Sequence, residues 1–145
     1  MTETPRSLWA RTTLHVWPER YRLVSLSTSH LAEAAALLSR GTGAFGTLIL
    51  ERDEVSLTLR EDLWEASSLR EAARAAQGPY RAITFALDLD LGVCGYLAPV
   101  AERLAGASIS IVPQCGFLKD HILVREEQLS LAVETIEEWI QACRG

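Results

Sequence analysis

A loop with two aspartates and two glycines is the part of this sequence best suited to bind a ligand. Asp88 and Asp90 are followed closely by Gly92 and Gly95. The glycines let a ligand approach the backbone without meeting a Cβ atom, and the carboxylates suit an ammonium group. Because Pro99 has no N–H to donate, the helix that follows this loop is expected to begin near Gly95.

The predicted helix start decides what this loop could bind. The backbone amides of residues 92–97 would lack helical partners, and they would lie at the positive end of the helix dipole. Such a terminus binds carboxylates and other small anions. Together with Asp88 and Asp90, it would suit the zwitterion of an amino acid. The alternative is that the glycines only turn the chain and the aspartates cap the helix.

Two cysteines and one histidine offer a different kind of chemistry. Cys94 precedes the predicted helix, whereas Cys115 and His121 lie near the ends of neighbouring predicted strands. A thiolate–imidazole pair is the minimum for covalent catalysis, and three such ligands could hold zinc. The spacing Cys-x20-Cys-x5-His matches no compact metal motif.

We therefore expect no catalytic residue and no metal site. Cys94 and Cys115 are expected to be small buried side chains, and His121 a packed or hydrogen-bonded strand residue. No glycine-rich phosphate-binding loop is present, so no nucleotide cofactor is expected. Trp64 and Trp139 could form a ligand cage, but Trp139 falls in an apolar helical stripe, which favours packing.

Composition limits the partners of this chain. Of its 145 residues, 48% are hydrophobic and 23% are charged, as in ordinary soluble globular proteins. The net charge is −5 and Lys119 is the only lysine, which disfavours binding to nucleic acid or to an anionic membrane. The N-terminus lacks an apolar signal-peptide core, and three cysteines show no paired spacing. These features predict a cytoplasmic protein.

Hydrophobic periodicity predicts five elements from residue 80 onward. Ile83, Phe85 and Leu87 alternate with less apolar residues, as in a half-buried strand. Strands are predicted at residues 80–89, 108–113 and 121–124, and helices at residues 96–105 and 128–143. This β-α-β-β-α order, with helices on one face of an antiparallel sheet, is typical of a ferredoxin-like unit.

The first half of the chain shows a similar order. Residues 1–13 are expected to form a loose leader on which Trp9 docks. Strands are predicted at residues 14–17, 21–27, 45–51 and 55–59, with a helix at residues 31–38. Ser68 and Glu71 have capping-box spacing, which predicts a second helix that Gly78 and Pro79 end. We interpret residues 14–78 and 79–145 as an internal duplication, with the two units packed together.

Three short motifs in the second half resemble those of ACT domains. They are Gly95-Tyr-Leu-Ala98 at the predicted helix start, Ile109-Ser-Ile111 on one strand and Asp120-His-Ile-Leu-Val124 on the next. The resemblance is strongest to tandem ACT-like proteins, a group that includes CASTOR-type arginine sensors and uncharacterised bacterial proteins. It is weaker in the first half, where Glu54-Val-Ser-Leu57 matches one element of that group.

The resemblance implies an α+β fold of two tandem ferredoxin-like units that bind a small molecule, usually an amino acid, where they meet. It also implies a ligand site at the loop before the helix and at the facing strand end. With the two aspartates added, the predicted ligand-binding residues are Asp88, Asp90, Leu91, Gly92, Val93, Cys94, Gly95, Cys115, Gly116, Phe117 and Asp120. Related proteins often have serine and threonine in place of Cys115 and Gly116, so two hydroxyl groups are missing here.

These observations predict a non-catalytic, amino-acid-binding regulatory protein. The alternative is a structural or protein-interaction module that keeps the fold and has lost the ligand, which the missing hydroxyl groups favour. A cleft filled by Phe117 or Tyr96 would support that alternative. A homodimer is expected, because unpaired strand edges invite a partner.

Overall fold

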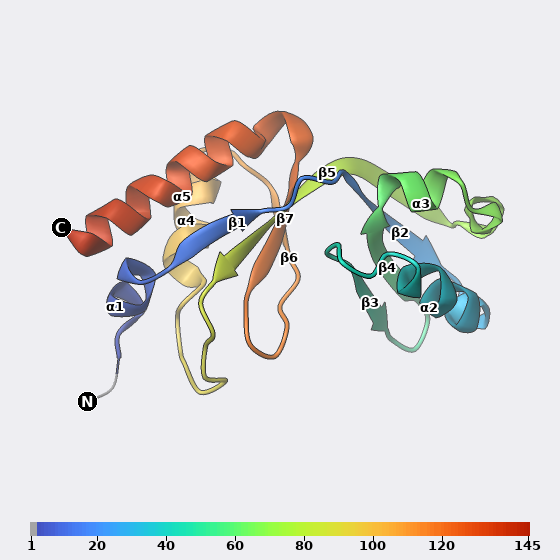
Figure 1. Cartoon of the computed structure of the whole chain (residues 1–145), viewed down its shortest axis with the longest axis horizontal. Helices are drawn as coiled ribbons and strands as arrows, with labels where there is room; N and C mark the ends of the chain where they lie inside the picture. The colour runs from blue at the N-terminus through green and yellow to red at the C-terminus, as the bar shows by residue number, and fades with distance from the viewer. Residues whose placement is uncertain (1–2) are drawn as a thin grey trace. The chain divides into compact units, whose positions relative to one another are not determined.

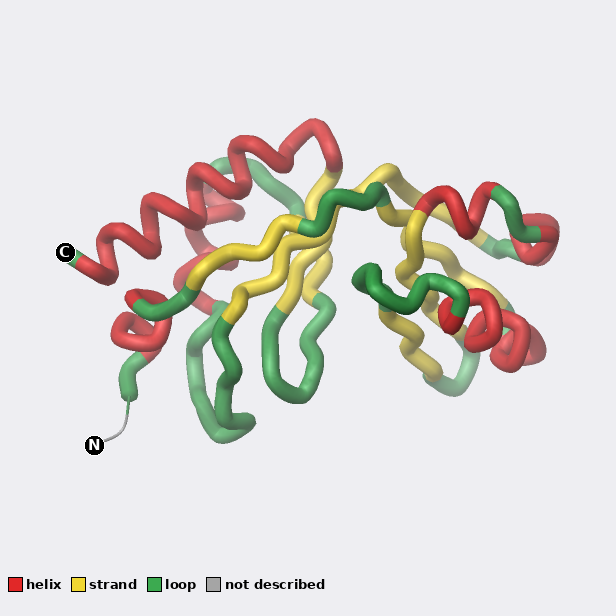
Figure 2. The backbone as a smooth tube through the Cα atoms, in the orientation of Figure 1, coloured by secondary structure: helices red, strands yellow, loops and turns green. Residues whose placement is uncertain are grey.

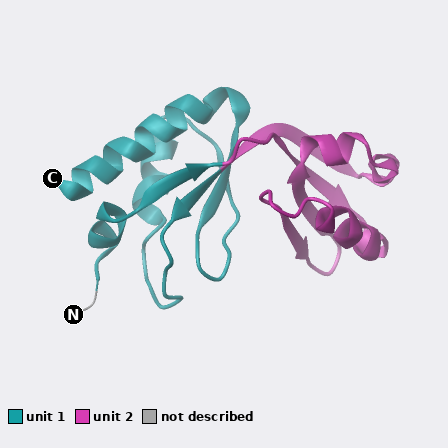
Figure 3. Ribbon diagram, in the orientation of Figure 1, with its two compact units in different colours: residues 1–16, 83–145 teal, residues 17–82 magenta. Residues whose placement is uncertain are grey.

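The computed structural model describes residues 3–145 and contains two compact units. Figure 3 shows the described residues of unit 1, 3–16 and 83–145, in teal and unit 2, residues 17–82, in magenta. Strand β5, Ala75–Ala86, gives its first part to unit 2 and its end to unit 1. Each unit has its own hydrophobic core.

Unit 1 has the strand order β1-β5-β7-β6. β1 pairs antiparallel with β5, and β6 pairs antiparallel with β7. Its other helices and strands, labelled in Figure 1, are α1 (Pro5–Ala10), β1 (Thr13–Val16), α4 (Ala98–Gly106), β6 (Ile111–Pro113), β7 (His121–Arg125) and α5 (Leu129–Arg144), which follows the 3₁₀ turn η3 (Glu126–Gln128).

The core of unit 1 lies between its sheet and the helices α4 and α5. Ile122 and Val124 alternate along β7, so both point to one face of the sheet, where they are fully buried. The helices meet that face through residues spaced by about one turn: Val100 and Leu104 in α4, and Ala132, Ile136 and Ile140 in α5. The predicted element order of residues 80–145 is confirmed, although α4 begins at Ala98 and not at Gly95.

The predicted loose leader is instead a helix that belongs to the core of unit 1. Thr4 and Ser7 form a capping box, and Pro5 occupies the first turn, so the short helix α1 is well started. Trp9 is fully buried, which confirms that it docks. Arg144 of α5 donates to the carbonyl of Ala10 at 2.9 Å. Met1 and Thr2, also part of that prediction, lie outside the described residues.

Unit 2 has the strand order β3-β4-β2-β5, with antiparallel pairs throughout. Its core contains nine buried residues: Val24, Leu26, Ala34, Leu37, Val55, Leu57, Leu59, Trp64 and Leu69. Its elements are β2 (Tyr21–Leu26), η1 (Thr28–His30), α2 (Leu31–Ser39), β3 (Thr47–Leu50), β4 (Val55–Arg60), α3 (Glu61–Glu65), η2 (Ser68–Ala72) and the start of β5. The short helix α3 was not predicted.

The predicted helix after Ser68 is wrong beyond its first turn. Ser67, not Ser68, accepts the first free amide, from Leu69 at 3.0 Å, and η2 ends at Ala72. The alanines that follow have high helix propensity, yet Ala75 and Ala76 pair with β2. Here the backbone hydrogen bonds to the neighbouring strand β2 outweigh the helix propensity of the alanines. Propensities of ordinary residues differ by less than about 1 kcal/mol per residue, so pairing with a strand can override them.

The boundary between the units also differs from the predicted one. Residues 14–16 were assigned to the first unit, but β1 pairs with the end of β5, where Leu14 faces Phe85 and Val16 faces Ile83. Strand β1 therefore belongs to unit 1, and the change of unit falls after Val16 and again after Ala82. Within residues 3–145, no helix has both the length and the apolar character that crossing a membrane requires.

Candidate functional site

A cleft of about 350 Å³ opens in unit 1 between two loops, and we call it the main cleft. One loop, residues 87–97, connects β5 to α4, and the other, residues 114–120, connects β6 to β7. Figure 2 shows both loops in green, at the same end of the strands. This volume lies within the usual range of small-molecule sites.

Most of the predicted site residues line the main cleft. They are Asp90, Leu91, Val93, Gly95, Cys115, Gly116, Phe117 and Asp120. The other three, Asp88, Gly92 and Cys94, line a second cleft of about 580 Å³ together with Leu8 of α1 and with Glu3 and Arg11 on either side of that helix. The two clefts share Leu89, Asp90 and Val93.

Sequence reasoning missed five residues that line the main cleft: Leu89, Tyr96, Leu97, Ala98 and Leu118. Tyr96 and Leu97 were placed inside a helix, where apolar side chains indicate a core. Because α4 begins later than predicted, both residues precede its first turn. Leu118 directly follows the predicted Phe117, so its position beside the site could have been expected.

Asp90 organises the loop before α4. Its Oδ1 atom accepts the amide of Gly92 at 2.7 Å, and its carbonyl accepts the amide of Val93 at 3.1 Å. As predicted, these two amides lack helical partners, but both bond to Asp90 and are not free for a ligand, because a short aspartate side chain readily closes a turn on its own backbone. Gly95 has φ of 81°, a conformation that side chains disfavour, so its place in the turn requires glycine.

The other predicted acidic partner, Asp88, already has a cation. Its carboxylate forms an ion pair with Lys119, and the Asp88 side chain is 63% exposed. It lines the second cleft and not the main one. Asp88 is therefore poorly placed to meet an ammonium group in the main cleft.

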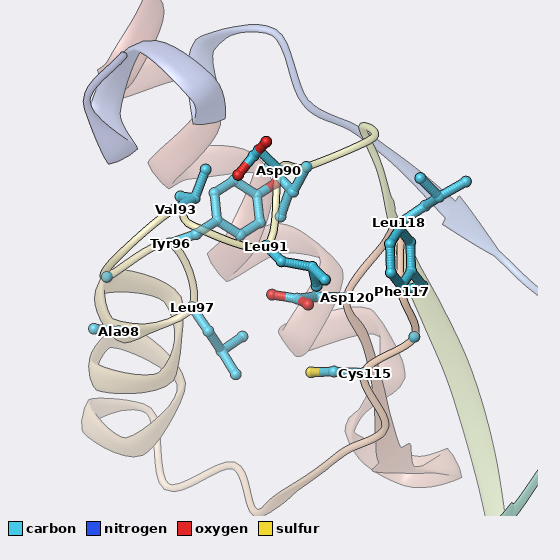
Figure 4. A pocket seen from close by; sticks show the side chains of 13 residues that line it. Asp90, Leu91, Val93, Tyr96, Leu97, Ala98, Cys115, Phe117, Leu118 and Asp120 are labelled. Atoms are coloured by element: carbon cyan, nitrogen blue, oxygen red, sulfur yellow. The ribbon is translucent and has the colours of Figure 1, made fainter. Parts of the chain in front are cut away.

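Asp120 and Cys115 are held together by the turn between β6 and β7. The amide of Gln114 donates to the carbonyl of His121 at 2.8 Å, and the amide of Gly116 donates to the carbonyl of Lys119 at 2.9 Å. Figure 4 shows the Asp120 carboxylate and the Cys115 sulfur directed into the space between the two loops.

Asp120 also sets the protonation of the neighbouring thiol. Partial loss of hydration raises the pKa of Cys115, and the Asp120 carboxylate raises it further through its charge and a hydrogen bond. The thiol therefore stays protonated at neutral pH. Cys94 and Cys115 are both exposed, which corrects the prediction that they are small buried side chains.

The thiol–imidazole chemistry considered above is poorly supported. The Nδ1 atom of His121 lies 2.7 Å from the Thr84 hydroxyl, which confirms a hydrogen-bonded strand residue. Burial lowers the pKa of His121, so its ring is mainly neutral at pH 7. Among residues 3–145, no group of three His, Cys, Asp or Glu side chains is arranged to hold a metal ion.

Tyr96 forms a rigid wall of the main cleft. Its ring stacks on Trp9 of α1 with centroids 4.3 Å apart and planes 3° apart. The Tyr96 hydroxyl lies 2.6 Å from the Thr12 hydroxyl, and the Trp9 indole donates to the Tyr96 carbonyl at 2.6 Å. Burial raises the pKa of Tyr96, so the phenol remains neutral. These contacts fix one wall of the cleft to α1.

Large apolar side chains are exposed around the mouth of the main cleft. Phe117 is 74% exposed, Leu91 is 69% exposed and Leu118 is 50% exposed. Neither Phe117 nor the buried Tyr96 fills the cleft, which remains open (Figure 4). The structure therefore lacks the filled cleft that would have supported a module without a ligand.

The beginning of α4 borders the main cleft through Leu97 and Ala98. Leu97 is the N-cap residue, and no side chain caps the helix there. Helix starts usually have a Ser, Thr, Asp or Asn cap, because the first amides lack helical partners. An anionic group in the cleft would therefore meet the positive end of this helix.

The sequence alone does not connect this chain to a described family. No family model matches it, and no curated protein matches it closely enough to count as a relative. A Vibrio cholerae protein of unknown function, described as a possible transport protein, superposes with a TM-score of 0.72 at 18% identity. That superposition covers 93% of this chain and 94% of the Vibrio protein.

Two aspartate kinase structures share the same fold. Aspartokinase III of E. coli, in complex with aspartate and ADP, gives a TM-score of 0.64 at 20% identity, over 88% of this chain but 33% of the enzyme. The ligand-free regulatory subunit of Thermus thermophilus aspartate kinase gives 0.63 at 8% identity, over 88% and 97% of the two chains. Such regulatory subunits consist of ACT domains, so this chain has an ACT-like fold.

Proposed function

We propose that this protein is a non-catalytic regulatory protein that binds an amino acid in the main cleft. The observation that carries this proposal is the open cleft with the Asp120 carboxylate on one side and the uncapped start of α4 on the other. An amino acid zwitterion has one positive and one negative group. The positive group would suit the Asp120 carboxylate, and the negative group would suit the start of α4.

The two ends of the ligand have separate partners in this proposal. The ammonium group would bind Asp120, because Asp88 pairs with Lys119 and Asp90 accepts an amide of its own loop. The carboxylate would lie at the start of α4, beside the Tyr96–Ala98 backbone. This assignment keeps the predicted site loop but transfers the amine-binding role to Asp120.

The structural comparisons support a regulatory role. The structures that share this fold include the regulatory subunits of aspartate kinase from Thermus thermophilus and Thermus flavus. We extend these likenesses to a cytoplasmic protein that forms a homodimer and contains two ACT-like units, one of residues 17–82 and the other of residues 3–16 and 83–145. The element order β-α-β-β-α in each half supports the duplication.

Tyr96 offers a route by which ligand binding could be transmitted. It lines the main cleft and also stacks on Trp9 in α1. A ligand that shifts Tyr96 would therefore displace α1 or change the environment of Trp9. A regulatory protein needs such a difference in contacts between its free and bound states.

A thermal-shift and calorimetric screen of the twenty amino acids tests the proposal. A ligand at 100 times its Kd should stabilise the protein by about 2.7 kcal/mol. Asp120→Asn should abolish that stabilisation, whereas Asp88→Asn, outside the main cleft, should leave it nearly unchanged. If no amino acid stabilises the protein at millimolar concentration, the proposal is wrong.

A second candidate, a protein-interaction module without a ligand, is favoured by the exposed Phe117, Leu91 and Leu118. Exposed apolar patches often mark binding surfaces for other proteins. In that case Phe117→Ser would reduce self-association, measured by sedimentation, and no amino acid would change the melting temperature.

A further inference from the structure

We infer that the ligand of the main cleft is an amino acid with an uncharged, apolar side chain, such as leucine, isoleucine, methionine or phenylalanine. This inference rests on the proposed function and specifies the ligand class. It follows from the charges that line the cleft and from the apolar surface at its mouth.

The charges in the main cleft disfavour acidic amino acids. Among the described residues, the lining includes the carboxylates of Asp90 and Asp120 and contains no lysine, arginine or histidine. The nearby Lys119 is paired with Asp88. A second carboxylate on the ligand would therefore approach two like charges and lose its hydration without gaining a cationic partner.

The same lining gives little to a basic side chain. Asp120 is needed for the α-ammonium group of the ligand, and the Asp90 carboxylate is occupied by the amide of Gly92. A guanidinium or second ammonium group would then lie against Leu97 and Leu118, where its loss of hydration is poorly compensated.

An apolar side chain would instead cover surface that is costly to leave in water. Leu91 comes from the loop before α4, whereas Phe117 and Leu118 come from the facing loop. All three are at least half exposed, and Figure 4 shows Leu91 and Phe117 on facing sides of the cleft. A branched or aromatic side chain between the loops would bury apolar area on both sides.

Leucine, asparagine and aspartate provide a matched test because their side chains have similar sizes and differ in polarity and charge. We expect calorimetry to show leucine binding at least about tenfold more tightly than asparagine, and aspartate binding more weakly still. Tighter binding of aspartate or arginine than of leucine would overturn the inference while leaving amino-acid binding intact. If none of the twenty amino acids binds, the proposed function itself fails.

The variant Phe117→Ser tests whether the ligand side chain lies at the mouth of the cleft. It should weaken leucine binding several-fold and leave glycine binding unchanged, because glycine has no side chain to contact Phe117. Leu131→Ser, at a 47% exposed position in α5, is the matched control and should change neither affinity. An equal loss for leucine and glycine would overturn the inference.

Discussion

At the residue scale, the site depends on how each carboxylate is already used. Asp88 binds Lys119, Asp90 closes its own loop, and Asp120 is hydrogen-bonded to the Cys115 thiol and points into the main cleft. The sequence identified all three, the first two by their position beside glycines and the third through a family resemblance. The sequence could not show which of the three carboxylates is best placed to bind a ligand, because that depends on hydrogen bonds and ion pairs made across loops.

The link between Asp120 and Cys115 gives a prediction about thiol reactivity. Because the Asp120 charge raises the pKa of Cys115, Asp120→Asn should lower that pKa and increase the thiolate fraction near pH 8. Alkylation of Cys115 should then become faster, by up to about tenfold for a change of one pKa unit. The rate is measured by mass spectrometry with iodoacetamide.

Cys94→Ser in every protein removes the competing exposed thiol from this measurement. Asp88→Asn is the control, since Asp88 pairs with Lys119 and should leave the Cys115 rate nearly unchanged. A slower reaction in Asp120→Asn than in the parent would contradict the assigned role of the Asp120 charge.

At the element scale, most strands and helices followed from periodicity, and the exceptions had particular causes. The first turn of α1 carries clear capping signals in Thr4, Pro5 and Ser7, but a helix of six residues is too short to show an apolar stripe. The start of β5 is rich in alanine, which favours a helix, yet it pairs with β2 as a strand. Short elements and strand pairings depend on partners that are distant in the sequence.

The helix α1 should be essential to unit 1 and not a removable leader. Trp9→Ala removes a fully buried ring that stacks on Tyr96, and we expect a loss of about 3–5 kcal/mol in unfolding free energy. Urea denaturation followed by circular dichroism measures this loss. Leu131→Ala, a half-exposed position in α5, should cost less than about 0.5 kcal/mol. Equal stabilities for the two variants would show that α1 does not contribute to the core.

The two glycines around α4 should respond in opposite ways to alanine. Gly95 has positive φ, so Gly95→Ala should cost about 1–2 kcal/mol, although a new Cβ would meet no atom closer than 3.8 Å. Gly106, the last residue of α4, has open space around it and no positive φ, so Gly106→Ala should stabilise the protein by about 0.4–1 kcal/mol. Thermal melts of both variants test this, and the same sign for both would contradict the assigned loop geometry.

At the scale of the whole molecule, the proposed duplication raises the question of a second ligand site. In unit 1, residues 87–97 separate β5 from α4 and form a glycine-containing loop beside the main cleft. At the corresponding place in unit 2, β2 ends at Leu26, and Ser27 caps η1, which leads directly into α2. The connection between β2 and α2 is therefore too short to form a loop like residues 87–97 of unit 1.

We therefore predict that each chain binds one amino acid and not two. Isothermal titration calorimetry with the tightest ligand of the screen should give a stoichiometry near one per chain. A value near two would show that unit 2 also carries a site. A value near one half would show that two chains share one site.

The sequence by itself determined the order of most elements and the loop around Gly92 and Gly95. These features are local, because hydrophobic periodicity, turn formation and helix capping depend on residues that are close together in the sequence. The tertiary structure decided that α1 belongs to the core, that β5 begins at Ala75, and that Asp120 is the carboxylate that points into the main cleft. Those outcomes depend on hydrogen bonds and packing between segments far apart in the chain, which no short stretch of sequence encodes.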